Sequence, residues 1–197
     1  MSIVIEHEKR RHEILEKALD VFMNEGFENV TFQKIADKCN ITRTTLYVYF
    51  KNKREIFNYS IKQLQQALEN NIIEIRKQKK LSHTEKLIRV MTVIMELLEK
   101  NSRLLSVAMN YLYYISKGDH DPDYQVRRRT VRLRHILATM LIEGIKAGEF
   151  AKSINVKDAN ELLYSFLEAG VFRLVVLDRD SVDELKDAIK LVVKRFG

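Results

Sequence analysis

Apolar residues recur at spacings of three and four along nearly the whole chain, a pattern typical of amphipathic α-helices. In the first such stretch, one face carries Ile14, Leu15, Ala18, Val21 and Phe22. One proline and six glycines among 197 residues leave few places for the turns between strands. The pattern therefore predicts an all-α protein, which capping signals divide into nine helices.

Capping residues in the first third of the chain indicate two very short helices. A first helix over about residues 8–25 ends at Gly26, which can adopt the left-handed conformation. Thr31 and Thr42 each begin a new helix, and Asn40 between them tolerates a left-handed turn. Two helices joined by so tight a turn are typical of the helix-turn-helix unit.

The later helices also begin at recognisable caps. These signals are Asn52 with Glu55, Ser82 with Glu85, Asp121 before Pro122, Asn155, and Ser181 with Glu184. We expect the N-terminal helix-turn-helix domain, of three helices, to span residues 1–51. Residues 52–197 would then form a helical domain for effector binding and dimerisation.

Composition narrows the class of protein further. The net charge of +7 is compatible with an anionic partner such as nucleic acid. A single cysteine excludes an internal disulfide and a cysteine-based zinc site, and it fits a reducing compartment. No apolar run approaches the length of a membrane span, so we expect a cytoplasmic protein with no membrane partner.

The short helix after Thr42 has two different faces. Leu46 and Phe50 are four residues apart and should face the preceding helices, which leaves Arg43, Thr44, Tyr47 and Val48 pointing outward. A solvated face is the alternative, but water does not favour an exposed tyrosine and valine. In a helix-turn-helix unit, this face is the one that enters the major groove of DNA. Arginine can bond guanine there, hydroxyls can donate or accept, and apolar groups can contact the thymine methyl.

The segment "TFQKIADKCNITRTTLYVYFKNKREIF" resembles the DNA-binding module of the tetracycline-repressor (TetR) family. The features that match are Thr31, Ile35-Ala36, Thr45-Leu46-Tyr47, Phe50 and Lys53. Asn40 stands where the family commonly has glycine, a change that should preserve the turn. The resemblance covers about 50 residues, and beyond them only the pattern of helices matches.

This resemblance implies a homodimeric transcriptional regulator, usually a repressor that a small molecule releases from a palindromic double-stranded DNA operator. By position, it implies phosphate contacts from Thr31, Tyr47 and Lys53. Lys51, just after the short helix, also suits a phosphate. The implied base or groove contacts are Arg43, Thr44, Thr45, Val48 and Tyr49. Two alternatives stay open: Tyr49 can instead pack against the first helix, and Lys51 can be solvated.

The last two predicted helices carry the candidate dimer interface. The stretch from Leu162 to Val175 is apolar on too many sides for one core, and such a helix must be buried nearly all round. We expect it to form a four-helix bundle with the final helix and their two symmetry mates. The candidate interface residues are Leu163, Phe166, Gly170, Leu174, Ile189, Val192 and Phe196. An enclosed helix in a monomer is the alternative.

The middle helices should enclose a hydrophobic or anionic small-molecule effector. Candidate lining residues are Met91, Met95, Met109, Tyr113 and Arg134, although methionine and aromatic stripes are also ordinary core. Arg134 lies at the edge of an apolar face, where a buried arginine requires an anionic partner. That partner is either a carboxylate such as Glu96 or Glu168, or an anionic ligand.

Other classes of protein fit the sequence less well. An all-helical enzyme would need a nucleophile, a base or a metal set, and no glycine-rich phosphate loop or serine elbow is present. We therefore expect no catalytic residues, no metal and no cofactor. A transcriptional activator of the same fold remains an alternative, as does a helical interaction module that does not bind DNA.

Overall fold

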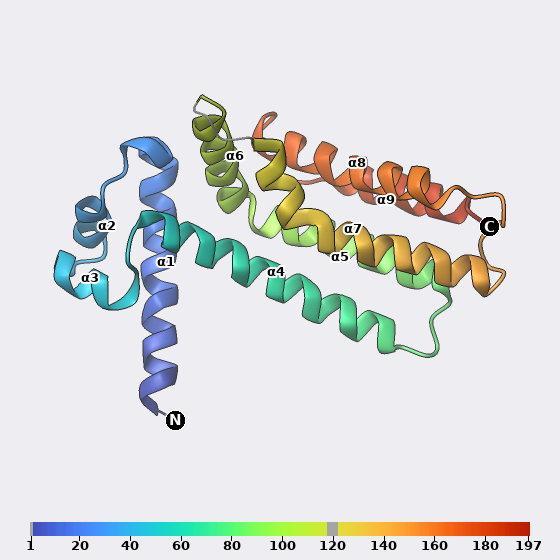
Figure 1. Cartoon of the computed structure of the whole chain (residues 1–197), viewed down its shortest axis with the longest axis horizontal. Helices are drawn as coiled ribbons and strands as arrows, with labels where there is room; N and C mark the ends of the chain where they lie inside the picture. Colours follow the sequence, from blue (N-terminus) through green and yellow to red (C-terminus); the bar gives the residue numbers. More distant parts are fainter. Residues whose placement is uncertain (1, 118–121) are drawn as a thin grey trace. The chain divides into compact units, whose positions relative to one another are not determined.

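The structure is a computed structural model that describes residues 2–117 and 122–197, with the backbone alone for 2–5, 122–123, 125–126 and 128–129. Nine helices and no strands form over these residues, as the sequence predicts (Figure 1). The helices are α1 (Ser2–Asn29), α2 (Phe32–Lys38), α3 (Arg43–Tyr49), α4 (Lys53–Lys77), α5 (His83–Lys100), α6 (Ser102–Ser116), α7 (Pro122–Lys146), α8 (Val156–Val175) and α9 (Asp183–Lys194). The predicted stop at Gly118 and the cap at Asp121 lie outside the described residues.

The caps around the helix-turn-helix are those expected from the sequence. Thr31 accepts a hydrogen bond from the backbone N–H of Lys34, and Thr42 accepts one from Thr45. Asn40 has φ +55°, so the tight turn does pass through the left-handed region. Gly26 has φ +74° and breaks the helical geometry of α1, although the last residues of the helix continue beyond it. Local capping therefore fixes the two short helices.

The chain divides into two compact units, and each is described by itself. The first unit comprises Met1–Gln65 and Arg103–His120, and the second comprises Gln66–Ser102 and Asp121–Gly197. This division assigns α6 and the start of α4 to the same unit as α1, α2 and α3. The predicted boundary after residue 51 concerns function and stays a prediction.

The first unit has a continuous apolar core that positions α3. Phe22 and Ile35, from α1 and α2, are fully buried together with Leu46 of α3. Leu104 and Val107 of α6 belong to the same buried cluster. α3 is too short to be stable alone, so this packing determines how it is held.

The second unit is a bundle in which α5, α7, α8 and α9 lie side by side (Figure 1). Its centre contains Leu87, Met91, Leu137, Leu141 and Leu163, all with no exposed surface. α5 packs against the other three helices of the bundle. The bundle is therefore organised around α5.

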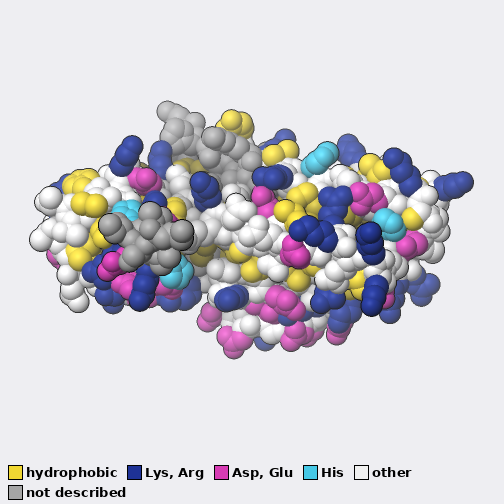
Figure 2. Space-filling view, turned by 90° about the horizontal axis from the view of Figure 1, so that it is seen from below, with side chains coloured by type: hydrophobic (Ala, Val, Ile, Leu, Met, Phe, Trp, Pro, Cys, Tyr) yellow, Lys and Arg dark blue, Asp and Glu magenta, His cyan; other side chains and the backbone are white. Residues whose placement is uncertain are grey.

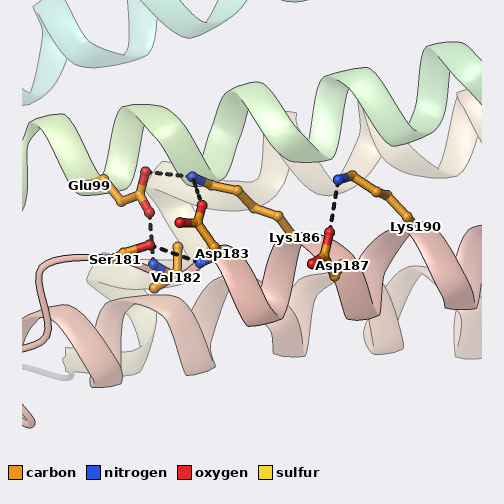
Figure 3. A network of polar contacts seen from close by, with 7 residues as sticks. All are labelled: Glu99, Ser181, Val182, Asp183, Lys186, Asp187 and Lys190. Carbon is orange, nitrogen blue, oxygen red and sulfur yellow. Dashed lines mark hydrogen bonds and ion pairs between the residues drawn. The ribbon is translucent and has the colours of Figure 1, made fainter.

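The start of α9 is held by a residue of α5. The N–H of Val182 donates to the Glu99 carboxylate over 2.7 Å, and the Lys186 ammonium lies 2.7 Å from the same carboxylate (Figure 3). Lys186 also lies 2.9 Å from Asp183. Burial alone would lower the pKa of Lys186, but the two carboxylates outweigh it and raise the pKa.

The predicted capping box of Ser181 with Glu184 is wrong. Val182 occupies the cap position and makes no side-chain cap bond, whereas Ser181 accepts from the N–H of Asp183. Glu184 pairs with Arg173 of α8 over 2.7 Å instead. Glu99, more than 80 residues earlier in the chain, replaces the local cap.

A second distant carboxylate stabilises the start of α5. Glu149 accepts the backbone N–H groups of His83 and Thr84, both over 2.9 Å. The predicted capping box of Ser82 with Glu85 is also present, so four donors at this helix start have partners. Burial alone would raise the pKa of Glu149, but the donated hydrogen bonds outweigh it and lower the pKa.

Candidate nucleic-acid interface

α3 presents an exposed face, as its sequence predicts. Leu46 is fully buried and Phe50 nearly so, whereas Arg43 and Thr44 are exposed. Tyr47 is 48% exposed and Val48 is 67% exposed, both large values for such side chains. An outward face of this composition matches what a base edge in the major groove can bond or contact.

The side chain of Tyr47 is ordered by contacts within its own chain. Its ring lies 4.8 Å from that of Phe32, measured between centroids. Its hydroxyl oxygen accepts a hydrogen bond from the Arg43 guanidinium over 3.0 Å. Because Arg43 and Tyr47 are one helical turn apart, the two side chains share one surface. This contact orders two of the predicted DNA ligands together.

The threonines of this region have different surroundings. The Thr45 and Thr42 hydroxyl oxygens are 2.8 Å apart, so Thr45 is partly engaged at the helix cap. Thr44 is exposed on the outward face. Thr31 accepts from the N–H of Lys34 over 3.2 Å, which leaves its hydroxyl proton able to donate to a phosphate.

Tyr49 turns back toward α1 instead of outward. Its ring stacks on that of His7, with 4.8 Å between centroids, and it packs against the apolar core of the first unit. Of the two roles that the sequence left open, the structure shows the packing role. The physical reason is the helical period: three residues after the buried Leu46, Tyr49 lies about 60° from it around the helix, at the edge of the buried side.

Lys53 has a structural role that could not be predicted from the amino-acid sequence. Its ammonium donates to the carbonyl oxygens of Phe27, Glu28 and Val30 over 2.7, 2.8 and 2.8 Å. An ammonium has three hydrogens, so these contacts use all of them. Burial lowers the pKa of Lys53. A phosphate contact would require the ammonium to release at least one of these carbonyls.

Lys51 is exposed, and its backbone N–H donates to the Glu55 carboxylate over 2.5 Å. The backbone N–H of Glu55 donates to the Asn52 side-chain oxygen over 2.9 Å, so α4 begins with the predicted Asn52 cap. The Lys51 side chain therefore stays at the surface beside the exposed face of α3. Figure 2 shows that basic side chains are interleaved with acidic ones on the face drawn there. Net charge alone would not have located this interface.

The candidate effector residues have different environments. Met91 and Met95 are fully buried in the second unit, and the Met95 methyl lies 3.0 Å from where a Cβ on Gly170 would be. Met109 and Tyr113, on α6 in the first unit, are 39% and 65% exposed. Plain core packing accounts for the two buried methionines.

Arg134 pairs with a carboxylate of its own chain. Its guanidinium lies 2.5 Å from Glu161 and 3.6 Å from the centroid of the Tyr164 ring. The hydrogen-bonded partner is Glu161, not the predicted Glu96 or Glu168; Glu168, about two turns further along α8, adds a weaker electrostatic attraction. The charge of Arg134 is therefore balanced within the protein.

Four of the candidate dimer residues serve the core of their own chain. Leu163 and Ile189 are fully buried, and Leu174 and Gly170 are nearly so. Phe166, Val192 and Phe196 are half-buried, and Phe196 packs edge-on against Phe150. The correction has a simple cause: α8 is apolar on several sides, and the buried side faces the bundle of its own chain.

A different set of apolar side chains, on α8, at its C-terminal end and on α9, is exposed. None of these residues was among the predicted interface residues, although their apolar character near the end of α8 was a usable signal. They are Leu162, Phe172, Val176, Leu177 and Leu191, with exposed fractions of 44%, 52%, 55%, 52% and 61%.

Two further observations limit the chemistry of the described residues. No group of three or more His, Cys, Asp or Glu side chains is arranged to hold a metal ion in the described part of the chain. None of the helices in that part is long and apolar enough to cross a membrane.

Comparison with known proteins agrees with the geometry of the helix-turn-helix. Residues 14–59 match the model for bacterial regulatory proteins of the tetR family. The chain is 25% identical over 171 residues to the fatty acid metabolism regulator protein of Bacillus subtilis (strain 168), covering 85% of this chain and 84% of that protein. It is 32% identical over 69 residues to the biofilm operon regulator IcaR of Staphylococcus aureus (strain Newman), covering 35% and 37% of the two chains.

A solved structure shares the fold over nearly the whole length. The transcriptional regulator FadR from Bacillus subtilis, in complex with stearoyl-CoA, superposes with a TM-score of 0.73 at 22% identity. The match covers 92% of this chain and 96% of that one. The exposed α3 face and the family match define a helix-turn-helix DNA-binding protein. Residues 14–59 carry the DNA-binding domain of the TetR family of transcriptional regulators.

Proposed function

We propose that this regulator binds a palindromic operator as a homodimer, represses transcription, and is released by a small molecule. The observation that carries the proposal is the outward face of α3, where Arg43, Thr44 and Val48 are exposed beside the ordered Tyr47. The other proposed contacts are Thr31, Thr45 and Lys51, with Lys53 as the tie that holds α4 to the end of α1.

The proposed contacts divide into two kinds. Arg43, Thr44 and Val48 would meet base edges, since they combine a bidentate donor, a hydroxyl and an apolar group. Thr31, Tyr47 and Lys51 would meet phosphates, which set the register but carry no sequence information. Substitutions in the first set should alter which DNA sequence is bound. Substitutions in the second set should weaken binding to all DNA sequences alike.

The exposed apolar residues of α8 and α9 support the homodimer. Phe172, Val176 and Leu191 are each more than half exposed. Contiguous exposed apolar patches mark interaction surfaces, and we propose that these side chains form such a patch. A two-fold dimer also suits the DNA proposal, because two recognition helices must meet half-sites about 34–36 Å apart.

We further propose a long-chain acyl-CoA thioester as the effector. The support comes from relatives: one is named a fatty acid metabolism regulator, and the structure of FadR contains stearoyl-CoA. Arg134 is not assigned to the acidic part of this ligand, because Glu161 already balances its charge.

Selection of bound duplexes from a random pool tests the DNA proposal directly. We expect an inverted repeat, with the Arg43→Ala variant losing preference at one position in each half-site. Enrichment of no sequence would overturn the proposed function.

Release from the selected duplex tests the effector. We expect stearoyl-CoA to dissociate the complex and to raise the melting temperature of the free protein, because a ligand of the folded state stabilises it. Free coenzyme A and stearate are the controls. A complex and a melting temperature that stearoyl-CoA leaves unchanged would exclude this effector without affecting the DNA proposal.

A further inference from the structure

An open hollow of about 870 Å³ lies beside the start of α3. Its walls come from α2, from the turn, and from the first residues of α3, all within the first unit. The lining residues are Gln33, Asp37, Asn40, Ile41, Thr42, Arg43 and Thr45. In a helix-turn-helix unit the N-terminal residues of the recognition helix contact base edges. Side chains that share this hollow with Arg43 are therefore placed beside the bases next to the one that Arg43 meets.

Two exposed residues of α2 form an ordered pair in this hollow. The Gln33 side-chain amide donates to the Asp37 carboxylate over 2.7 Å, across one helical turn. A carboxylate only accepts, so Asp37 requires the NH₂ end of the amide and fixes which way Gln33 is turned. Gln33 then keeps one N–H donor and one carbonyl acceptor for another partner.

That remaining pair of groups is complementary to one base. Adenine presents an acceptor, N7, and a donor, the N6 amino group, in the major groove, whereas guanine presents two acceptors. We propose that Gln33, oriented by Asp37, reads an adenine in each half-site next to the base read by Arg43. This inference rests on the proposed operator binding, and it extends base reading from α3 to α2.

The charge of Asp37 supports this role. Among residues 31–50, Asp37 is the only acid, against the basic Lys34, Lys38 and Arg43. A carboxylate on a surface that meets phosphates weakens binding to every duplex, since affinity depends on neutralising phosphate charge. The orientation of Gln33 is a role that would offset this unfavourable effect of Asp37 on DNA affinity.

The neighbouring position on α2 offers a matched control. Lys38 is exposed there, beside Val21 and Asn24 of α1, and it does not line the hollow next to Arg43. Lys38→Ala should therefore weaken binding to all duplexes alike and leave base preference unchanged.

The test is selection from a random duplex pool with the full-length wild type and with Gln33→Ala, Asp37→Ala, Asp37→Asn and Lys38→Ala. Affinities for single-base variants of the selected site follow. Replacing the proposed adenine pair by a G·C pair should weaken wild-type binding about 5- to 150-fold. Gln33→Ala should abolish this difference, and Asp37→Ala should reduce it. Asp37→Asn should keep it, because the asparagine oxygen still accepts, and should raise affinity for all duplexes.

Thermal unfolding of each variant checks that the domain remains folded. The proposal is overturned if Gln33→Ala selects the same site with the same discrimination, or if the position it affects is a G·C pair in the wild-type site. It is also overturned if Asp37→Ala and Asp37→Asn discriminate equally. A wild type that selects no sequence would overturn the proposed function itself, and this inference with it.

Discussion

The ammonium nitrogen of Lys53 lies 2.7 Å from the carbonyl oxygen of Phe27, so the first residue of α4 closes the end of α1. The carbonyls of Glu28 and Val30 complete the same site. Carbonyls at the end of a helix have no partner within that helix, and a cation there is doubly favourable. This contact ties the chain segments on either side of the helix-turn-helix to each other.

Loss of this contact should destabilise the DNA-binding unit. We expect Lys53→Ala to lower the free energy of unfolding by about 2 kcal/mol, because three carbonyls lose a charged donor. Chemical denaturation measures the change, and Lys51→Ala, which removes an exposed lysine nearby, is the control. Equal stability of the two variants would contradict this role.

The Lys53→Ala variant also shows whether Lys53 acts through the stability of the fold or through the phosphate contact that the family resemblance implies. If Lys53 also neutralises a phosphate, the slope of log affinity against log salt should fall by about 0.9. If Lys53 acts only through the end of α1, affinity should drop with the slope unchanged. The three carbonyl contacts lead us to expect the unchanged slope.

The pair of Glu99 and Lys186 should be strongly coupled. Their side chains are only 20% and 13% exposed, and Glu99 also accepts the N–H of Val182 (Figure 3). We expect Lys186→Met to cost about 1–3 kcal/mol, since a part-buried carboxylate loses its main partner. A double-mutant cycle with Glu99→Gln isolates the interaction energy between Glu99 and Lys186. A coupling energy near zero would refute the expected coupling. Lys190→Met, which removes an exposed pair with Asp187, is the control and should cost little.

Glu149 should make the second unit sensitive to acid. Its pKa is lowered in the folded state, because hydrogen bonds donated by His83 and Thr84 outweigh its burial. A lowered pKa gives stability that is present above the unfolded-state pKa and is lost as pH falls through the folded-state value. We expect Glu149→Gln to cost about 1 kcal/mol at neutral pH and to cost progressively less at acidic pH. Denaturation at several pH values checks this, and a penalty that does not depend on pH would contradict it.

The two sides of α8 should respond differently to substitution. Leu163 is fully buried, so Leu163→Ala should cost about 2–5 kcal/mol of stability. Phe172 is 52% exposed, so Phe172→Glu should leave the folded protomer intact and weaken self-association. Light scattering across a range of concentrations measures assembly. A Phe172→Glu protein that associates as the wild type does would place the interface elsewhere.

Local signals were enough to predict the helix-turn-helix. Thr31, Asn40 and Thr42 act through neighbours within four residues, and α3 is too short to have more than one buried side. The resulting prediction that Tyr47 and Val48 point outward is confirmed. Tyr49 was ambiguous because it lies at the edge of the buried side, about 60° around the helix from Leu46.

Contacts between distant segments could not be predicted in this way. Nothing near Val182 indicates that Glu99 will accept its N–H, so Ser181 and Glu184 looked like a local cap. The apolar sides of α8 showed that it needed several neighbours, but not which neighbour each side would meet. Leu163 and Gly170 were therefore assigned to a partner chain, although α5 and the rest of the bundle surround them.

The carboxylate of Glu99 at the start of α9 also bears on the order of events during synthesis. Helix α5 emerges from the ribosome long before α9, yet the first turn of α9 depends on Glu99, and α5 depends on α9 for part of its cover. The second unit therefore cannot complete its bundle until α9 has been synthesised, whereas α1, α2 and α3 can begin to fold much earlier.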